Sequence, residues 1–395
     1  MVSVAGLLTL VVAAVASLFM AWAIGAGSSG STPFAPAVGA NAISVMRAGF
    51  FVGILGFAGA VLQGANVSEA VGKQLILGAT LTPVAATAAL LTAAGLVAFG
   101  VFTGYPIATA FTVTGAVVGT GLALGGEPAW AKYQQIVTLW VLVPFVGGFI
   151  AYVTARLLRD WADEAVAVPL LAGLVGALLA NVKFVLLGPP GVGWSAARTI
   201  AASIGPLSDL VARVAVTLAL GALTTAVVHY DVSRDEDAAQ RHFLLALGAL
   251  VAFSAGGSQV GLAVGPLLPL IGDDVPLVYV LVGGGIGLLA GSWTGAPRMI
   301  KALAQDYSSL GPRRSIAALI PSFAIAQTAV FFGIPVSFNE IIVSAIVGSG
   351  LAAGGRAGIS RRKMGFTVLA WIGSLAISLV FGYGVYFALE LAGLH

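Results

Sequence analysis

The sequence predicts an all-α polytopic membrane protein with about 10–12 transmembrane helices, inverted-topology repeats and broken or re-entrant helices. Three observations lead to this fold class. The composition is 59% hydrophobic and only 8% charged, whereas a soluble domain carries about 25% charged residues. Long apolar stretches recur along the whole chain, and one segment occurs twice, in residues 104–126 and again in residues 333–355.

The apolar stretches are long enough to cross a lipid bilayer as helices. A spanning α-helix needs about 20 apolar residues, whereas a barrel strand needs roughly 9–11 residues that alternate in polarity. The stretches in this chain are longer and do not alternate, so we expect helical spans. In chain order they cover residues 3–26, 48–65, 75–102, 104–125, 134–155, 165–189, 207–229, 242–271, 275–293, 314–332, 334–354 and 365–393.

The repeated segment indicates that the chain consists of duplicated halves. GYPIATAFTVTGAVVGTGLALGG and GIPVSFNEIIVSAIVGSGLAAGG share ten of 23 positions without a gap. Duplicated halves are typical of secondary transporters, whose binding site lies where the halves meet. We expect residues 1–133 to form the first inverted repeat and residues 242–395 the second, with a C-terminal span. Residues 134–241 would then hold inserted scaffold spans and a cytoplasmic linker.

Basic residues predict how the chain is oriented in the cell membrane. Loops rich in Lys and Arg stay in the cytoplasm, and four charged loops fit this rule: 156–164, 229–242, 298–314 and 356–363. The corresponding first-half loops, 66–74 and 125–133, hold one lysine each and fall on the opposite side, so the repeats are expected to be inverted. Residues 156–229 have no counterpart, and we interpret them as an inserted scaffold or oligomerisation segment. A homodimer is a possible assembly.

Two further glycine-rich segments, residues 23–39 and 253–270, place Gly, Ser and Pro inside hydrophobic stretches. In lipid such a break is costly unless the freed backbone groups line a cavity, and a helix start there suits an anion. The alternative is that these small residues only let helices pack closely. If the breaks line a cavity, their residues can bind the substrate with hydrogen-bond donors that carry no charge. These predicted substrate-binding residues are Gly27, Ser28, Ser29, Ser31, Thr32, Gly257, Ser258 and Gln259.

The repeated GxP segments follow the same logic. Pro106 and Pro335 should each end a helix and leave a helix start just beyond. The polar residues predicted to complete the site there are Thr109, Ser337, Asn339 and Glu340. An ionisable residue at membrane depth is a functional candidate by default, so we expect Glu340 to carry the coupling proton. The alternative is a structural glutamate near the membrane interface.

Motifs for soluble-type chemistry are missing from the sequence. The chain has no cysteine, no GxxxxGK[ST] phosphate loop and no HExxH motif, so we expect no thiol chemistry, no ATP-driven transport by this chain alone, no metal and no cofactor. The small net charge of +3 gives no reason to expect nucleic-acid binding. An intramembrane enzyme is an alternative class of function, but nothing in the sequence pairs a nucleophile with a base. The protein is therefore predicted not to be an enzyme.

Several segments together resemble the inorganic phosphate transporter (PiT) family over nearly the full length outside the middle insertion. They are GANVSEAVGKQLI (64–76), the two repeated GxP segments, and the W-x4-R stretch Trp293–Arg298. The resemblance implies an inverted-repeat transporter that moves a tetrahedral inorganic oxyanion together with a coupling cation.

The sequence also departs from the family pattern. Gly27-Ser28 and Gly257-Ser258 stand where the family has Asn-Asp, which resembles its sulfate-permease branch. Sulfate is fully deprotonated and only accepts hydrogen bonds, whereas phosphate retains a proton that a carboxylate can recognise. We therefore expect a sulfate transporter working by alternating access as a proton symporter. The alternatives are a sodium-coupled phosphate transporter and a non-transporting oxyanion sensor on the same fold.

Overall fold

A computed structural model describes residues 4–161, 163–189, 193–204, 208–271 and 275–394. The expected loop 156–164 therefore has one residue, position 162, outside the described residues. The first half of the chain forms α1 Val4–Ile24, the π-helix η1 Gly25–Ser29, α2 Ala35–Gly39, α3 Val45–Gln63, α4 Ala65–Lys73, β1 Ile76–Leu77, α5 Pro83–Thr103, α6 Thr109–Ala123, β2 Glu127–Pro128, α7 Trp130–Arg156, the π-helix η2 Leu157–Trp161 and α8 Glu164–Ala180.

The second half continues with β3 Lys183–Phe184, β4 Trp194–Ser195, α9 Ala196–Ala201, α10 Asp209–Arg234, α11 Glu236–Val264, the 3-10 helix η3 Gly265–Leu267, α12 Leu268–Ile271, α13 Leu277–Thr294, α14 Ala296–Gln305, α15 Pro312–Phe332, α16 Phe338–Gly354, the 3-10 helix η4 Gly355–Gly358 and α17 Arg361–Leu391. The strands are two residues long and form two antiparallel pairs, β1 with β2 and β3 with β4.

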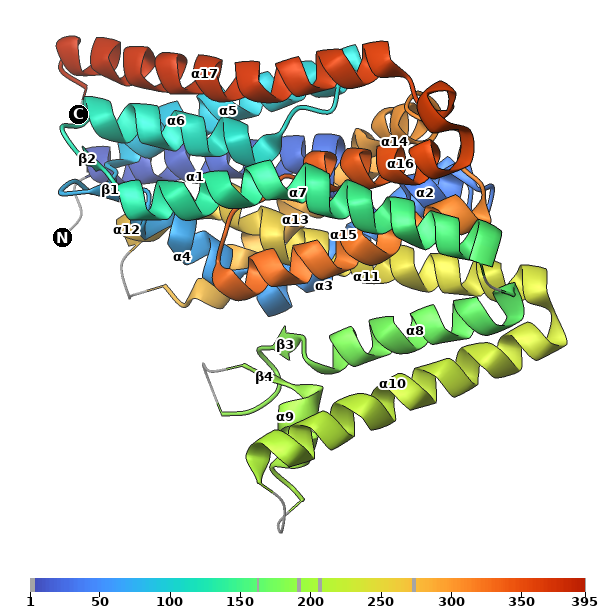
Figure 1. Ribbon diagram of the computed structural model, residues 1–395. Coiled ribbons are helices and arrows are strands. Elements are labelled where there is room, and N and C mark those ends of the chain that lie inside the picture. Colours follow the sequence, from blue (N-terminus) through green and yellow to red (C-terminus); the bar gives the residue numbers. More distant parts are fainter. Residues whose placement is uncertain (1–3, 162, 190–192, 205–207, 272–274, 395) are drawn as a thin grey trace.

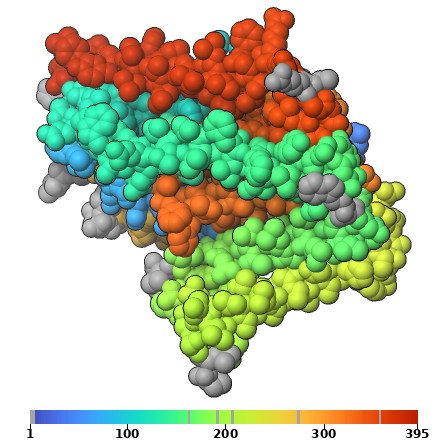
Figure 2. Space-filling view, viewed as in Figure 1, coloured from blue at the N-terminus to red at the C-terminus, as the bar shows by residue number. Residues whose placement is uncertain are grey.

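Among the described residues, nine helices are long and apolar enough to cross a membrane, and α6, α8 and α16 are shorter apolar helices. This confirms the prediction of an all-α polytopic membrane protein. Most of the long helices lie side by side in one bundle, in which α1 begins and α17 ends at the same end (Figure 1). Helices α8, α9 and α10 form a separate hairpin along one edge, which projects from the bundle in the space-filling view (Figure 2).

The charged segment 229–242 is helical apart from Asp235, so the expectation of a loop there is wrong, although most of its residues are exposed. Helix α10 continues to Arg234 and α11 begins at Glu236, so that only Asp235 separates them. The Asp235 carboxylate accepts a hydrogen bond from the Ala238 backbone N–H at 3.0 Å. Aspartate at this position caps a helix N-terminus, so polar residues that suit a loop equally suit two helix ends joined at one capping residue.

The expected span 165–189 ends early. Helix α8 stops at Ala180, and the Asn181 amide turns back to donate a hydrogen bond to the Ala177 carbonyl at 3.0 Å. Beyond it, Lys183 pairs with Ser195 and Phe184 with Trp194 in the short β3–β4 ladder. The polar pair Asn181 and Lys183 thus marks the end of the helix, although hydrophobic residues continue to Leu187.

Helices α3 and α11 contact each other backbone to backbone. A methyl group added at Gly256 would lie 1.8 Å from the Gly56 carbonyl oxygen, and one added at Gly59 would lie 1.8 Å from the Phe253 carbonyl oxygen. Small residues allow such close approach in membrane proteins, where packing rather than hydrophobicity drives helix association. The glycines near residue 257 therefore hold α11 against α3.

We expect Gly256→Ala to destabilise the folded protein by about 1–3 kcal/mol, because the two backbones must separate to admit the methyl group. The measurement is thermal unfolding of the detergent-purified protein. Gly283→Ala on α13 is the matched control, since a methyl group there meets no atom within 4 Å. Equal unfolding temperatures for the two variants would contradict the close α3–α11 contact.

Candidate oxyanion site

The two GxP segments have the same local structure. Gly104 caps the C-terminus of α5 and Gly333 caps that of α15, and both glycines are left-handed, with φ of 76° and 60°. Glycine adopts this conformation without a Cβ penalty, and the proline two residues later cannot continue a helix. New helices begin at Thr109 and Phe338. The prediction that each GxP segment breaks a helix and leaves a helix start beyond it is confirmed.

The two helix starts meet the glycine-rich segments at a cluster of hydrogen bonds centred on Gln259. Its side-chain oxygen accepts hydrogen bonds from the Thr109 hydroxyl at 2.7 Å and from the Ser28 hydroxyl at 3.2 Å. The Gln259 amide nitrogen donates to the Val336 carbonyl at 2.6 Å. Residues from η1, α6, α11 and the second GxP segment are thus joined at one side chain.

Asn339 makes a second junction in the same cluster. Its side-chain nitrogen donates to the Gly27 carbonyl at 2.9 Å and to the Ile107 carbonyl at 2.7 Å. Gly27 is close to Val101, since a methyl group on it would lie 2.8 Å from the Val101 Cγ2 atom. The start of α16 is therefore tied to η1 and to the first GxP segment, and the chain positions predicted from the two repeats converge.

The remaining predicted serine and threonine residues differ in whether their hydroxyl groups have a hydrogen-bond partner. The Ser31 and Thr32 hydroxyls donate back to the Ser28 carbonyl at 3.1 and 3.0 Å. The Ser337 hydroxyl accepts from the Glu340 backbone N–H at 3.5 Å as the cap of α16. The buried hydroxyls of Ser29 and Ser258 have no hydrogen-bond partner among the described residues, so they remain as donors.

The second glycine-rich segment differs from the expectation. Helix α11 continues through Gly257, Ser258 and Gln259 to Val264, and the chain departs from α-helix only at Gly265–Leu267. The backbone at Gly257 is therefore paired within the helix and does not form a helix start. Gly257 also lies beside Gln63 of α3, where a methyl group would lie 2.7 Å from the Gln63 Cβ atom. Both segments are therefore interrupted, the first by η1 and the turn after it and the second by η3, but the second break lies beyond the predicted site residues.

Glu340 lies 2% exposed, and its Oε2 atom has no hydrogen-bond partner among the described residues. Burying an unpaired carboxylate is expensive, so the group is stable there when it is protonated or holds a cation. Phe111 occupies the corresponding position of the first copy and stacks on Trp140, with ring centroids 3.9 Å apart. The duplicated segments thus provide a single carboxyl group.

The cluster carries neither a metal ligand set nor a positive charge. Among the described residues, no group of three His, Cys, Asp or Glu side chains could hold a metal ion. The polar side chains that form the cluster are hydroxyls and amides, and Glu340 follows Asn339 in the chain. Ser28, Thr109, Gln259 and Asn339 are each 0% exposed, so a substrate reaches them only after helices move apart.

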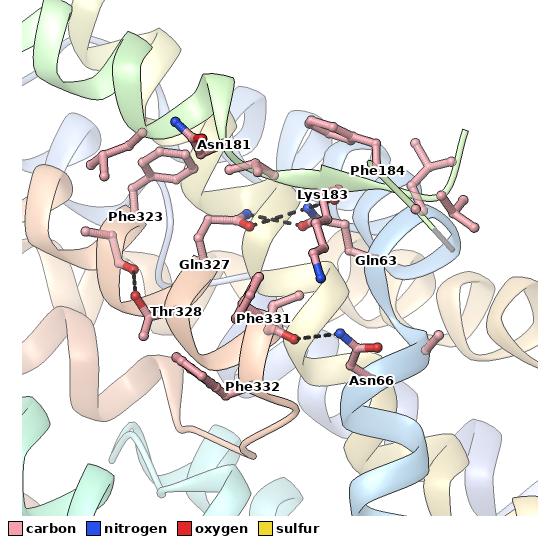
Figure 3. A pocket seen from close by; sticks show the side chains of 18 residues that line it. Gln63, Asn66, Asn181, Lys183, Phe184, Phe323, Gln327, Thr328, Phe331 and Phe332 are labelled. Atoms are coloured by element: carbon pink, nitrogen blue, oxygen red, sulfur yellow. Dashed lines mark hydrogen bonds between the residues drawn. The ribbon is translucent and has the colours of Figure 1, made fainter. Parts of the chain in front are cut away.

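A separate cleft of about 410 Å³ lies between the α8–β3 end of the hairpin and helices α3, α4 and α15 (Figure 3). Gln63 and Gln327 face each other across it, and the Gln327 amide donates to Gln63 Oε1 at 3.1 Å and to the Ser254 hydroxyl at 2.6 Å. This pair was not predicted. The available signal was an amide in each of two apolar spans, but nothing in the sequence brings them together.

The comparisons with known proteins agree with this architecture. Residues 24–382 match the model of the phosphate transporter family. A protein of Chlamydia pneumoniae named "putative phosphate permease" is 26% identical over 94% of this chain and 96% of its own length. The chloroplastic inorganic phosphate transporter 2-1 of Arabidopsis thaliana is 24% identical over 85% of this chain and 65% of its own length.

A solved structure titled as the sodium-dependent phosphate transporter has the same fold. It superposes with a TM-score of 0.81 and 23% sequence identity, covering 97% of this chain and 99% of its own. The family match extends over most of the chain, from η1 to α17, and so includes both GxP segments and every predicted site residue. The chain therefore belongs to the phosphate transporter family.

Proposed function

We propose that the protein is a secondary transporter that moves a tetrahedral inorganic oxyanion across the cell membrane by alternating access, with sulfate preferred and protons as the coupling ion. The observation that carries the proposal is the buried hydroxyl and amide cluster around Gln259, which joins both halves of the chain. Glu340, the acidic residue in the first turn of α16, follows Asn339 of this cluster in the chain.

The anion would bind beside Gln259, accepting hydrogen bonds from the Gln259 amide N–H and from the two hydroxyls that now donate to Gln259 Oε1. Ser28 and Thr109 already direct their hydroxyls at that oxygen, and sulfate oxygens accept hydrogen bonds equally well. The unpartnered hydroxyls of Ser29 and Ser258 add donors. The first turns of α6 and α16 also contribute backbone N–H groups that lack a partner within the helix, and the positive ends of helix dipoles favour an anion.

Sulfate is preferred because the cluster offers donors and little that would accept a proton from the substrate. Phosphate near neutral pH retains a proton, and a carboxylate acceptor would recognise it, but Gly27-Ser28 and Gly257-Ser258 supply no carboxylate. The lack of carboxylates at these positions also removes hard oxygen ligands for sodium, which leaves Glu340 to carry a proton.

The placement of the basic segments on the cytoplasmic side of the membrane also stays a prediction.

Alternating access would follow from inverted repeats. Helices α6 and α16, which begin after the two GxP segments, run in opposite directions along the bundle (Figure 1). Opposite directions of corresponding helices are expected when two repeats are inserted upside down relative to each other. In such a protein each half can adopt the conformation of the other, which gives alternating access. The full burial of the Gln259 cluster fits a conformation closed to both sides.

Sodium-coupled phosphate transport is the second candidate. It is favoured by the fold shared with the structure titled as a sodium-dependent phosphate transporter and by relatives named as phosphate permeases. In that case backbone carbonyls and hydroxyls near Ser28 and Glu340 would hold sodium, because hard cations take oxygen ligands.

Uptake into proteoliposomes tests the proposal. Purified protein is given radiolabelled sulfate or phosphate under an inward proton gradient and, separately, under an inward sodium gradient. We expect sulfate to accumulate under the proton gradient. Phosphate accumulation driven by sodium would overturn the sulfate proposal in favour of the second candidate, and tight binding of either anion without flux would identify a sensor.

A further inference from the structure

Each GxP segment is held by a tryptophan from a distant helix. The Trp140 indole N–H donates to the Pro335 carbonyl at 2.9 Å, and the Trp371 indole N–H donates to the Pro106 carbonyl at 2.8 Å. Both indoles are buried. A carbonyl in a broken helix has lost its helical partner, and inside a membrane it needs another donor. The two tryptophans provide that donor at corresponding positions of the two copies.

A lysine accompanies each tryptophan. The Lys132 ammonium donates to the Gly333 carbonyl at 3.2 Å, and the Lys363 ammonium donates to the Gly104 carbonyl at 3.4 Å. In both helices the lysine precedes the tryptophan by eight residues, as KYQQIVTLW and KMGFTVLAW. Eight residues are about two helical turns, so both side chains lie near one face of the helix. The hydrogen bonds of the lysine and the tryptophan are therefore duplicated, and Lys363 in addition forms an ion pair with Asp306 at 3.1 Å.

Helices α7 and α17 each pack against the copy of the repeat that they do not follow in the chain. Helix α7 follows α6 in the chain but contacts α16, where a methyl group on Gly348 would lie 2.0 Å from the Gly148 carbonyl oxygen. Helix α17 follows α16 but contacts α6, where a methyl group on Gly119 would lie 2.1 Å from the Leu379 carbonyl oxygen. Figure 1 shows α17 lying along α6 and α7 passing α16.

The segments held in this way carry the backbone of the candidate site. The residue after Pro106 is Ile107, whose carbonyl accepts from the Asn339 side chain at 2.7 Å. The residue after Pro335 is Val336, whose carbonyl accepts from the Gln259 side chain at 2.6 Å. One peptide unit thus separates each tryptophan contact from a hydrogen bond of the Gln259 cluster.

We propose that Lys132 with Trp140, and Lys363 with Trp371, form two crossed clamps that position the site carbonyls and tie the motion of each GxP segment to the other half. The pattern also assigns α7 to the first half, whose boundary then moves from residue 133 to the end of α7. The expected effect of the clamps on transport rests on the proposed function. The claim that each GxP segment is held by a helix of the other copy rests only on the hydrogen bonds and helix contacts described above.

Hydrogen–deuterium exchange tests the crossing without any transport assay. We expect Trp140→Phe to speed amide exchange in residues 333–338 by about fivefold while leaving residues 104–109 unchanged, and Trp371→Phe to do the reverse, because each loses one buried hydrogen bond. Trp293→Phe is the matched control, since it also loses an indole bond to a backbone carbonyl, that of Phe50 at 3.2 Å. Equal changes in both segments, or none beyond the control, would overturn the proposal.

Uptake kinetics test the positioning role. In proteoliposomes with equal amounts of folded protein, both clamp variants should raise the KM for the transported anion about fivefold relative to Trp293→Phe. A lower Vmax at unchanged KM would mark the tryptophans as merely structural. If the unsubstituted protein moves neither sulfate nor phosphate, the proposed function is wrong. The hydrogen–deuterium exchange of the two variants then still shows whether each tryptophan holds the GxP segment of the other copy.

Discussion

Glu340→Gln is expected to abolish proton-driven accumulation of the anion, reducing it to the level of protein-free liposomes. Glutamine keeps the shape and hydrogen-bonding capacity of a protonated carboxyl group but cannot release a proton. Glu340 is buried, and its Oε2 atom has no hydrogen-bond partner among the described residues, so the coupling proton is assigned to this one carboxyl group. Uptake by the unsubstituted protein should rise as the external pH falls, whereas uptake by the variant should be independent of pH.

The variant should still exchange labelled anion for unlabelled anion across the membrane, because exchange requires substrate binding and no net proton movement. This separates loss of coupling from loss of folding. Glu69→Gln provides the control, since Glu69 is an exposed glutamate at another position of the bundle. If Glu340→Gln retained pH-driven accumulation, Glu340 would not be the coupling group, and its burial would be structural.

Gln259→Leu is expected to weaken anion binding by roughly 10–100-fold, the cost of leaving one or two buried polar groups unpaired. Leucine has a similar volume but makes none of the three hydrogen bonds to Ser28, Thr109 and Val336. The KM from uptake and the Kd from equilibrium binding in detergent should rise together, because the substitution changes the site that the anion occupies.

Gln135→Leu serves as the matched control, because Gln135 lies exposed on α7. The thermal unfolding of both variants should be measured, since a site residue that also ties helices together lowers stability. Unchanged KM and Kd in Gln259→Leu at normal amounts of folded protein would show that the anion binds elsewhere. The cleft beside Gln63 and Gln327 would then be the next candidate.

The sequence predicted those parts of the site that depend on local chemistry. Gly104, Pro106 and their second-half counterparts can be recognised because glycine and proline restrict the backbone wherever they occur. The structure places breaks there, and Thr109 and Asn339 at the helix starts beyond them. Duplication helped, because each copy supported the interpretation of the other.

The errors arose where one residue type serves two purposes. Gly257 and Ser258 suggested a site at a helix break, but the break in residues 253–270 lies further on, at Gly265–Leu267, and Gly256 and Gly257 bring α11 against α3. Charged residues at 229–242 suggested a loop, but they equally suit helix ends capped by Asp235. The pairing of Gln63 with Gln327 was not predictable, because it joins residues from distant spans and neither carries a local signature.

The contact of α17 with α6 has a consequence for the order in which the protein is made. During translation the first GxP segment enters the membrane long before residues 361–371, which supply Lys363 and Trp371. Until α17 is inserted, the Pro106 carbonyl lacks that donor in a medium without water. The first half therefore lacks the hydrogen bonds to its Gly104 and Pro106 carbonyls until α17 has been inserted, so its GxP segment is completed late in synthesis.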